Sequence, residues 1–266
     1  MTWAGESLQA LAEAHDWCEA LGHETRQASH CRLVLDREHP ELWSGNHASG
    51  VRASEPPDIE RTLAEIEAAF AYSRYRVVDV DGLTPPTFVA RLALEEFEEQ
   101  PAVILMTLGG ALAPVQAPPI TISAVASEDE WSEVRRLLEL DHAELSRGGR
   151  ADLTPEVTRG IFANFRVKAE FGGVFLARWE GRSCAYAAAI PAPGDFGLVD
   201  DLFTVQSFRR RGIASAMVRH CIAHLRGCGS ETVFLTARAA DRPKRLYARL
   251  GFRPAMLARR YVKRVG

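Results

Sequence analysis

A basic, glycine-containing turn is the part of this sequence with the clearest chemistry. Three consecutive arginines, Arg209 to Arg211, and Gly212 follow an apolar, β-branched run at residues 198–205. After the turn, apolar residues recur at intervals of three and four, which indicates one face of a helix. The stretch is therefore expected to fold as strand, turn and helix, with the arginines at the helix start. The apolar residues of the helix are Ile213, Met217, Val218, Cys221, Ile222 and Leu225.

A turn of this kind at a helix N-terminus can bind an anion. The first N–H groups of a helix have no partner within it, and that end carries roughly half a positive charge. Gly212 has no Cβ to keep a phosphate away from the backbone, and the three arginines add cationic charge. The stretch is thus predicted to cradle a pyrophosphate group.

Spacing distinguishes the families that bind phosphate in this way. The stretch has neither the Gly-x-x-x-x-Gly-Lys-Ser/Thr pattern nor the Gly-x-Gly-x-x-Gly pattern. Residues 209–214, Arg-x-x-Gly-x-Ala, instead resemble the pyrophosphate loop of the GNAT superfamily of N-acetyltransferases. Residues 246–252, Leu-Tyr-x-x-Leu-Gly-Phe, resemble the last helix of that superfamily, one helix and one strand further along. The resemblance covers residues 120–264.

The resemblance implies a fold, an acyl donor and a set of binding residues. The fold is expected to be α/β (α+β), with a central mixed, mostly antiparallel sheet flanked by helices and a smaller N-terminal α/β domain. The donor is expected to be acetyl-CoA, with no metal. The strand before the loop would offer backbone groups of Phe203, Thr204 and Val205 to the pantetheine arm, and Arg209 would steady the loop. The amides expected to take the pyrophosphate are those of Arg210, Arg211, Gly212, Ile213, Ala214 and Ser215.

Acetyl transfer to an amine also needs an acid and a base. A departing thiolate, with a reference pKa of ~8.5, gains from a nearby acid, and an alkylammonium, at ~10.4, must lose a proton to attack. Tyr247 occupies the position of the superfamily's usual acid; alternatively, it is a packed aromatic residue.

Residues 200–204, Asp-Asp-Leu-Phe-Thr, resemble the Glu-Asp-Leu-Tyr-Val stretch of polyamine-type members of the superfamily, in which the acidic residue aligned with Asp200 acts on the amine. Side chains alternate along a strand, so only one of Asp200 and Asp201 is expected to face the cleft, and Asp201 is the second choice as base. Either aspartate could instead only attract a cationic amine, or form an ion pair.

Composition excludes several other classes of function. The chain has 266 residues, 47% hydrophobic and 25% charged, with a formal net charge of −3, so no nucleic-acid partner is expected. The five cysteines show neither metal-ligand spacing nor a paired framework, which favours reduced thiols in a cytoplasmic protein. No apolar run approaches the ~20 residues of a membrane span, and no secretory signal is expected. His39 and His47 are expected to be solvated or structural rather than metal ligands.

The chain is expected to form two domains. Residues 111–119, rich in Ala and Pro, are predicted to link an N-terminal module, residues 1–110, to an acetyltransferase domain, residues 120–266. Helix, strand, helix, strand over residues 58–108 echoes the second half of the GNAT fold. The module is therefore interpreted as a degenerate GNAT-like unit, or else as an unrelated α/β domain. Strands are expected in the C-terminal domain at residues 120–124, 173–179, 183–190 and 231–237.

These features predict an acetyl-CoA-dependent N-acetyltransferase that acts on a primary amine. The acceptor is not identified. Arg147 and Arg150 lie in the loop where the superfamily builds its acceptor pocket, and they could meet an anionic acceptor or be solvated loop charges. Two alternatives stay open: a tandem acetyltransferase like mycothiol synthase, and a non-catalytic coenzyme A sensor or binding protein. No membrane partner is expected, and both a monomer and a homodimer are compatible with the sequence.

Overall fold

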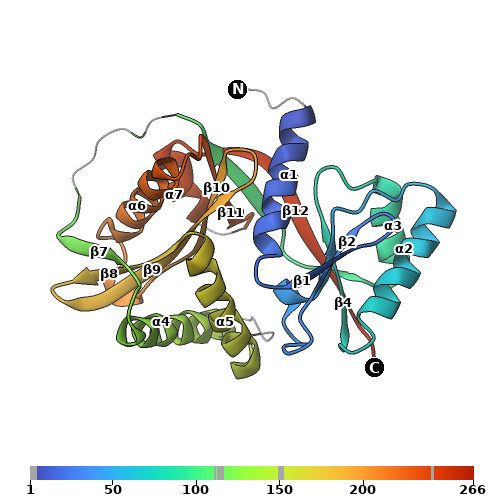
Figure 1. The fold of residues 1–266 in the computed structure, drawn as a ribbon, viewed down its shortest axis with the longest axis horizontal. Coiled ribbons are helices and arrows are strands. Elements are labelled where there is room, and N and C mark those ends of the chain that lie inside the picture. The colour runs from blue at the N-terminus through green and yellow to red at the C-terminus, as the bar shows by residue number, and fades with distance from the viewer. Residues whose placement is uncertain (1–4, 111, 113–116, 149–152, 241–242) are drawn as a thin grey trace. The chain divides into compact units, whose positions relative to one another are not determined.

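The computed structural model describes residues 5–110, 112, 117–148, 153–240 and 243–266 (Figure 1). The chain folds as two compact units, and the first contains the described residues of 1–106, 237–244 and 254–266. The second contains those of 107–236 and 245–253. Much of the expected linker, residues 111–119, lies outside the described residues, so the expected domain boundary stays a prediction. Within the described residues, no helix combines the length and apolar character needed to cross a membrane.

The second unit contains the mixed, mostly antiparallel sheet expected from the sequence, which confirms the fold class. Strands β7 to β10 pair in antiparallel order, and β11 pairs with β10 in parallel. The strands are β7 (Ile120–Ala124), β8 (Gly173–Trp179), β9 (Arg182–Ala192), β10 (Phe196–Thr204) and β11 (Thr232–Arg238). The helices are α4 (Glu128–Arg147), α5 (Pro155–Phe171), α6 (Ile213–Gly227) and α7 (Pro243–Leu250), with a 3₁₀ turn η2 (Gln206–Phe208).

Helices cover both faces of this sheet (Figure 1). The start of α4 is fixed by a capping box between Ser127 and Glu130, and Thr154 caps α5. Alternation along β8 assigns the faces: Val174 and Leu176 pack in the core that α4 and α5 supply. Phe175 points the other way, where its ring meets the rings of two α6 histidines at centroid distances of 4.6 and 5.0 Å. α6 and the α4–α5 pair therefore lie on opposite faces.

The first unit is a second α/β arrangement with its own core. Strands β1, β2 and β3 pair antiparallel in sequence order, β3 pairs parallel with β4, and the C-terminal strand β12 pairs antiparallel with β4 and β5. The strands are β1 (Glu24–Gln27), β2 (Arg32–Leu35), β3 (His47–Ser49), β4 (Tyr75–Val80), β5 (Glu98–Glu99) and β12 (Arg253–Arg264). β6 (Val103–Leu108) runs from this unit into the second. The helices are α1 (Gly5–Glu19), α2 (Pro56–Ala69) and α3 (Pro86–Leu94), with η1 (Trp43–Gly45).

A buried polar group lies within the first unit. His47 on β3 is fully buried, and its Nε2 is 3.7 Å from Oδ2 of Asp79 on β4. Two hydrogen bonds of 2.6 Å join Asp79 to Arg260 of β12. Burial lowers the pKa of His47, which keeps the imidazole neutral. Among the described residues, no group of three or more His, Cys, Asp or Glu side chains is arranged to hold a metal ion.

Candidate functional site

A bulge interrupts β10 at the two aspartates. Asp200 is opposite Ala188 of β9, but Phe203 is opposite Tyr186, so three steps along β10 match two along β9. The extra residue is Asp201, whose φ of 52° lies in the left-handed region. A bulge of this kind bends the strand and re-aims the side chains beside it.

Because of the bulge, both carboxylates reach the same cation. Nζ of Lys168, on α5, donates to Oδ2 of Asp200 at 2.7 Å and to Oδ2 of Asp201 at 2.8 Å. The expectation that the two aspartates point to opposite faces is wrong, since the inserted residue breaks the alternation. The sequence analysis also missed Lys168, because a lysine near the end of an amphipathic helix carries no signal until its partners on β10 are known.

Lys168, Asp200 and Asp201 form a charge cluster that is largely shielded from water, with 14%, 19% and 29% of their side-chain surfaces exposed. Burial raises the pKa of Asp201 to about 7, and the Asp200 carboxylate acts in the same direction. Burial also acts to raise the pKa of Asp200, but the Lys168 ammonium outweighs it and holds that pKa below its usual range. At neutral pH the cluster therefore contains a firm ion pair and a carboxyl group that can exchange a proton.

Tyr247 is close enough to this cluster for the charge of Asp200 to act on its hydroxyl. Its side chain, on α7, is 8% exposed, and its ring packs edge-on against Phe252 at a centroid distance of 6.2 Å. Burial raises the pKa of Tyr247 to about 12, and the negative charge of Asp200 acts in the same direction. The hydroxyl therefore stays protonated throughout the physiological range.

The end of β10 separates from its parallel neighbour. The register with β11 pairs residues 196–199 with residues 232–235, and the described registers pair the rest of β10 with β9 alone. The hydroxyl oxygen of Thr204 is buried and has no hydrogen-bond partner among the described residues. Both backbone groups of Val205 are in use: its N–H donates to Cys184 O and its carbonyl accepts from Phe208 N, each at 2.9 Å. Phe203 and Thr204 are registered with β9 alone, so the edge of β10 that faced β11 is open there, except that the Thr204 carbonyl accepts from Nε of Arg209 at 2.8 Å.

The loop after β10 leaves the start of α6 accessible. Gly212 is the N-cap of α6 with φ 81°, and its helix end has no side-chain cap. A Cβ at Gly212 would find its nearest neighbour, Cδ of Pro118, at 3.9 Å, so it is the backbone conformation that favours glycine. Ile213, Ala214 and Ser215 form the first turn of α6, where backbone N–H groups lack partners within the helix.

The three arginines of the loop have different surroundings. Arg209 donates from Nε to the carbonyl oxygen of Thr204 at 2.8 Å and from Nη2 to Glu144 on α4. The guanidinium of Arg211 lies over the rings of Trp179 and Phe208, at 5.4 and 5.6 Å from their centroids. Arg210 is exposed, with φ 63°. All three arginines are exposed, and Arg209 ties the loop to the strand before it.

Residues 131–252 match the model of the acetyltransferase (GNAT) family. This part of the chain is a GNAT domain. It contains the bulge, the loop and Tyr247. A search of curated proteins found no significant match.

Solved structures extend the likeness beyond the GNAT domain. A GCN5-related N-acetyltransferase from Kribbella flavida is 19% identical with a TM-score of 0.74, and the match covers 97% of this chain and 96% of that one. Another, from Sphaerobacter thermophilus, is 14% identical with a TM-score of 0.61, covering 97% and 91%. A tandem GNAT protein from the clavulanic acid biosynthesis pathway is 14% identical with a TM-score of 0.61, covering 89% and 78%. At these identities the likeness concerns the fold, and it includes the first unit.

A cavity of about 470 Å³ lies between α4 and α5 of the GNAT domain. Its lining includes Arg135, His142 and Phe162, and it lies next to the loop that joins the two helices. Arg147 is exposed and donates from Nε to the carbonyl of Ala143 in its own helix, at 3.1 Å. Arg150 lies outside the described residues.

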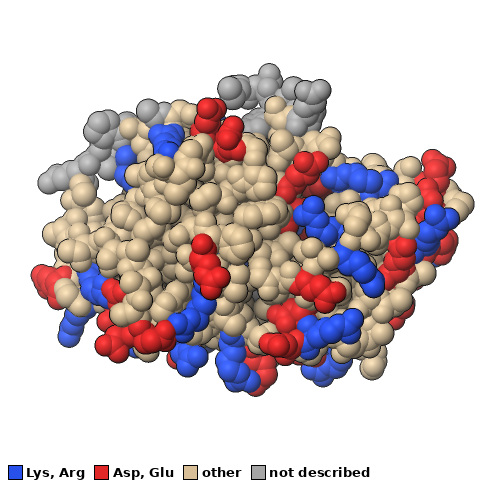
Figure 2. Space-filling view, viewed as in Figure 1, with Lys and Arg blue, Asp and Glu red and all other residues tan. Residues whose placement is uncertain are grey.

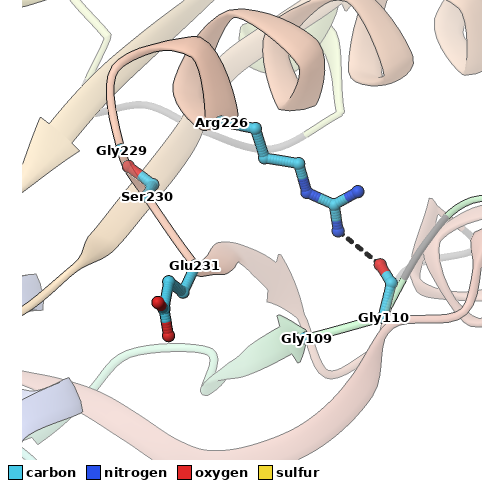
Figure 3. Close-up of a pocket in the computed structure, with 6 residues that line it drawn as sticks. All are labelled: Gly109, Gly110, Arg226, Gly229, Ser230 and Glu231. Atoms are coloured by element: carbon cyan, nitrogen blue, oxygen red, sulfur yellow. Dashed lines mark hydrogen bonds between the residues drawn. The ribbon is translucent and has the colours of Figure 1, made fainter.

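A second cavity of about 470 Å³ lies at the other end of α6 (Figure 3). There Arg226 reaches toward Gly110 and donates to its carbonyl oxygen, and the side chain of Glu231 stands beside the opening. The negative end of the α6 dipole and this carboxylate disfavour a polyphosphate. The first turn of α6 is therefore the better position for a pyrophosphate.

Figure 2 shows acidic and basic side chains interspersed over one face, in keeping with 32 basic and 35 acidic residues in the chain.

Proposed function

We propose that the GNAT domain transfers the acetyl group of acetyl-CoA to a primary amine of an acceptor. The observation that carries the proposal is the joining of two features on one strand. β10 bears the Asp200–Asp201 pair at its bulge, and it leads directly into the Gly212 turn that opens α6. A site for proton transfer and a site for a pyrophosphate thus lie within one strand–turn–helix segment.

The residues at the end of β10 and in the loop suit a donor of this kind. The separation of β10 from β11 opens the strand edge at Phe203 and Thr204 to the amides of the pantetheine arm, with the Thr204 carbonyl already bonded to Arg209. The unpartnered Thr204 hydroxyl is a further polar group that a ligand would satisfy. The amides of residues 210–215 and the Arg210 guanidinium would take the pyrophosphate, while Arg209 holds the loop in shape.

The carboxylates of Asp200 and Asp201 and the hydroxyl of Tyr247 suggest how the acetyl group is transferred. The amine gives a proton to one of the two carboxylates, Asp200 or Asp201, and its nitrogen forms a bond to the acetyl carbonyl carbon. The carbon–sulfur bond then breaks and the electron pair leaves with sulfur. Since the pKa of Tyr247 is about 12 and that of a thiol is ~8.5, complete transfer of the tyrosine proton is unfavourable. Tyr247 is therefore assigned as a hydrogen-bond donor to the developing thiolate, whose final proton comes from solvent.

The cavity between α4 and α5 is the proposed entry for the acceptor. It joins an apolar surface from Phe162 to the charged side chains of Arg135 and Glu139. Such a lining suits an acceptor with an apolar body and polar substituents, and leaves its identity open.

The test is to incubate the full chain with acetyl-CoA and a broad amine panel, including cysteinyl amino sugars. We expect acceptor-dependent release of free coenzyme A and a product heavier by one acetyl group. The Gly212→Glu variant should lose this activity. Tight acetyl-CoA binding without turnover on any amine would instead identify a coenzyme A-binding protein and overturn the proposed reaction.

A further inference from the structure

Lys168 lies beside the reacting groups, yet the transfer described above gives it no task. Its ammonium is shared between two carboxylates at 2.7 and 2.8 Å, and it also lies 5.7 Å from the centroid of the Phe165 ring. A structural ion pair on a helix needs only one carboxylate. The second is within reach because Asp201 adopts a left-handed conformation, which residues other than glycine seldom adopt.

We propose that Lys168 is a positioning residue of the acetyl transfer, which holds Asp200 ionised and leaves Asp201 as the carboxylate that accepts the amine proton. The inference rests on the proposed function and assigns the base within it. Two carboxylates that share one cation cannot both be neutralised by it, so one of them keeps its affinity for a proton. Asp201 is the more exposed of the two, at 29% against 19% for Asp200, and is the one that an acceptor reaches more easily.

The other titratable groups around the pair do not duplicate this role. On β9, burial raises the pKa of Tyr186 far above neutrality, and its hydroxyl donates to Asp141 of α4 at 3.2 Å. On α7, Tyr247 stays protonated. α6 packs on the opposite face of the sheet, through Phe175. Burial raises the pKa of Asp141 to about 6, so this carboxyl must be distinguished from Asp201 by experiment.

The first test is the pH dependence of kcat/KM for the wild type, Lys168→Met, Lys168→Arg and Arg166→Met. In the wild type we expect an acidic limb near pH 7, reporting Asp201. Without the cation, repulsion between the carboxylates remains, so in Lys168→Met the limb should move up by at least about one pH unit. For a shift of one unit, the rate at pH 7 should then fall about five- to sixfold, since the ionised fraction drops from one half to about one eleventh, and it should largely recover by pH 9.

Two controls separate this effect from a loss of structure. Lys168→Arg keeps the charge and should keep the wild-type limb. Arg166 lies two residues before Lys168 on α5. Arg166→Met removes its exposed ion pair with Glu128 of α4 and should also leave the limb in place. The acceptor's own titration is common to all four proteins and cancels when their profiles are divided. A Lys168→Met limb that superimposes on the wild type overturns the inference.

The second test needs no acceptor, so it separates this inference from the proposed function. Carbon-13 NMR of the aspartate carboxyl groups should show one resonance that titrates near pH 7. It should be lost in Asp201→Asn and retained in Asp141→Asn. In Asp200→Asn it should titrate at lower pH, because the negative charge of residue 200 is gone and Lys168 then pairs with Asp201 alone. If no such resonance exists, or if it is unchanged in Asp201→Asn, the assignment of Asp201 is wrong even if the enzyme is active. If it exists in a protein without acetyl transfer, the charge arrangement stands and the proposed function fails. If Lys168→Met does not fold, the carbon-13 titration of Asp201 tests the inference in its place.

Discussion

The hydroxyl of Tyr186 donates a hydrogen bond to Oδ2 of Asp141 at 3.2 Å. The tyrosine, on β9, is 1% exposed, and the aspartate belongs to α4, so the bond joins the central sheet to the helix that covers it. This hydrogen bond lowers the pKa of Asp141, but burial outweighs it and raises the pKa to about 6. The carboxyl therefore costs stability once it is ionised.

Replacing Asp141 by Asn should stabilise the protein at neutral pH. The folded-state pKa of Asp141 lies above the usual value, so the folded state keeps a proton that the unfolded state loses. Stability therefore falls as pH rises from about 4 to about 6. An amide oxygen can still accept from Tyr186 and carries no charge. We expect Asp141→Asn to raise the free energy of unfolding at pH 8 by up to about 2 kcal/mol.

Urea denaturation at pH 4 and pH 8 checks this prediction. Little difference between the two proteins is expected at pH 4, where the carboxyl is protonated in the folded state and only about half ionised in the unfolded state, so most of the penalty has not yet developed. Glu139→Gln, an exposed carboxyl on the same helix, serves as the control and should change stability little at either pH. An equal gain at both pH values would mean that ionisation of Asp141 is not the cause.

The Gly212→Glu substitution should weaken acetyl-CoA binding at least about tenfold, or by 1.4 kcal/mol. It places a carboxylate at the uncapped start of α6 and a side chain at φ 81°, where glycine is favoured. Gly227→Glu adds the same charge at the other end of the helix, where a Cβ has no neighbour within 4 Å. Calorimetry should show near wild-type affinity for this control. Equal affinities for both variants would remove the loop from the binding site.

The β10–α6 segment shows which parts of the site a sequence can predict. The strand, the arginine turn and the helix follow from hydrophobic periodicity and a glycine, which are local features. The shared ammonium of Lys168 does not, because the bulge depends on how β10 registers with β9. That register is a property of paired strands. The rule that side chains alternate along a strand therefore fails at Asp201, the residue proposed to accept the amine proton.

The C-terminal strand shows the same limit for the fold. Residues 253–264 carry too many basic side chains to suggest a strand, and none was predicted there. In the structure β12 pairs with β4, and Arg260 is matched by two hydrogen bonds to Asp79, 181 positions away in sequence. His47 was expected to be either solvated or structural, and only the completed sheet decides between these, because it shows His47 on β3, buried beside Asp79.

Tyr247→Phe should lower kcat roughly ten- to a hundredfold, toward the low end for a positioned acid, because a phenol with a pKa of about 12 donates a hydrogen bond rather than a full proton. The affinity for acetyl-CoA should change little, since the ring keeps its packing on Phe252. Steady-state kinetics and calorimetry measure the two quantities separately. Tyr261→Phe, whose hydroxyl bonds Glu99 at 2.7 Å in the first unit, is the matched control and should keep full turnover. Unchanged turnover in both variants would make Tyr247 a packing residue.

The full chain should bind one coenzyme A, in the GNAT domain. In the first unit, α2 and α3 begin with proline, which has no N–H to donate: Pro56 and Pro57 open α2, and Pro86 follows Pro85 at the start of α3. Asp58 adds negative charge to the first turn of α2. These helix starts therefore offer few of the convergent donors that a pyrophosphate needs.

Calorimetric titration of the whole chain measures this stoichiometry directly. A fragment of residues 119–266 is a poor substitute, because it would separate β12 from its partner β4. We expect one site in the wild type and none of comparable affinity in Gly212→Glu, with Gly227→Glu still binding one. Two sites in the wild type, or one tight site left in Gly212→Glu, would place coenzyme A in the first unit. That outcome would contradict the assignment of donor binding to the GNAT domain alone.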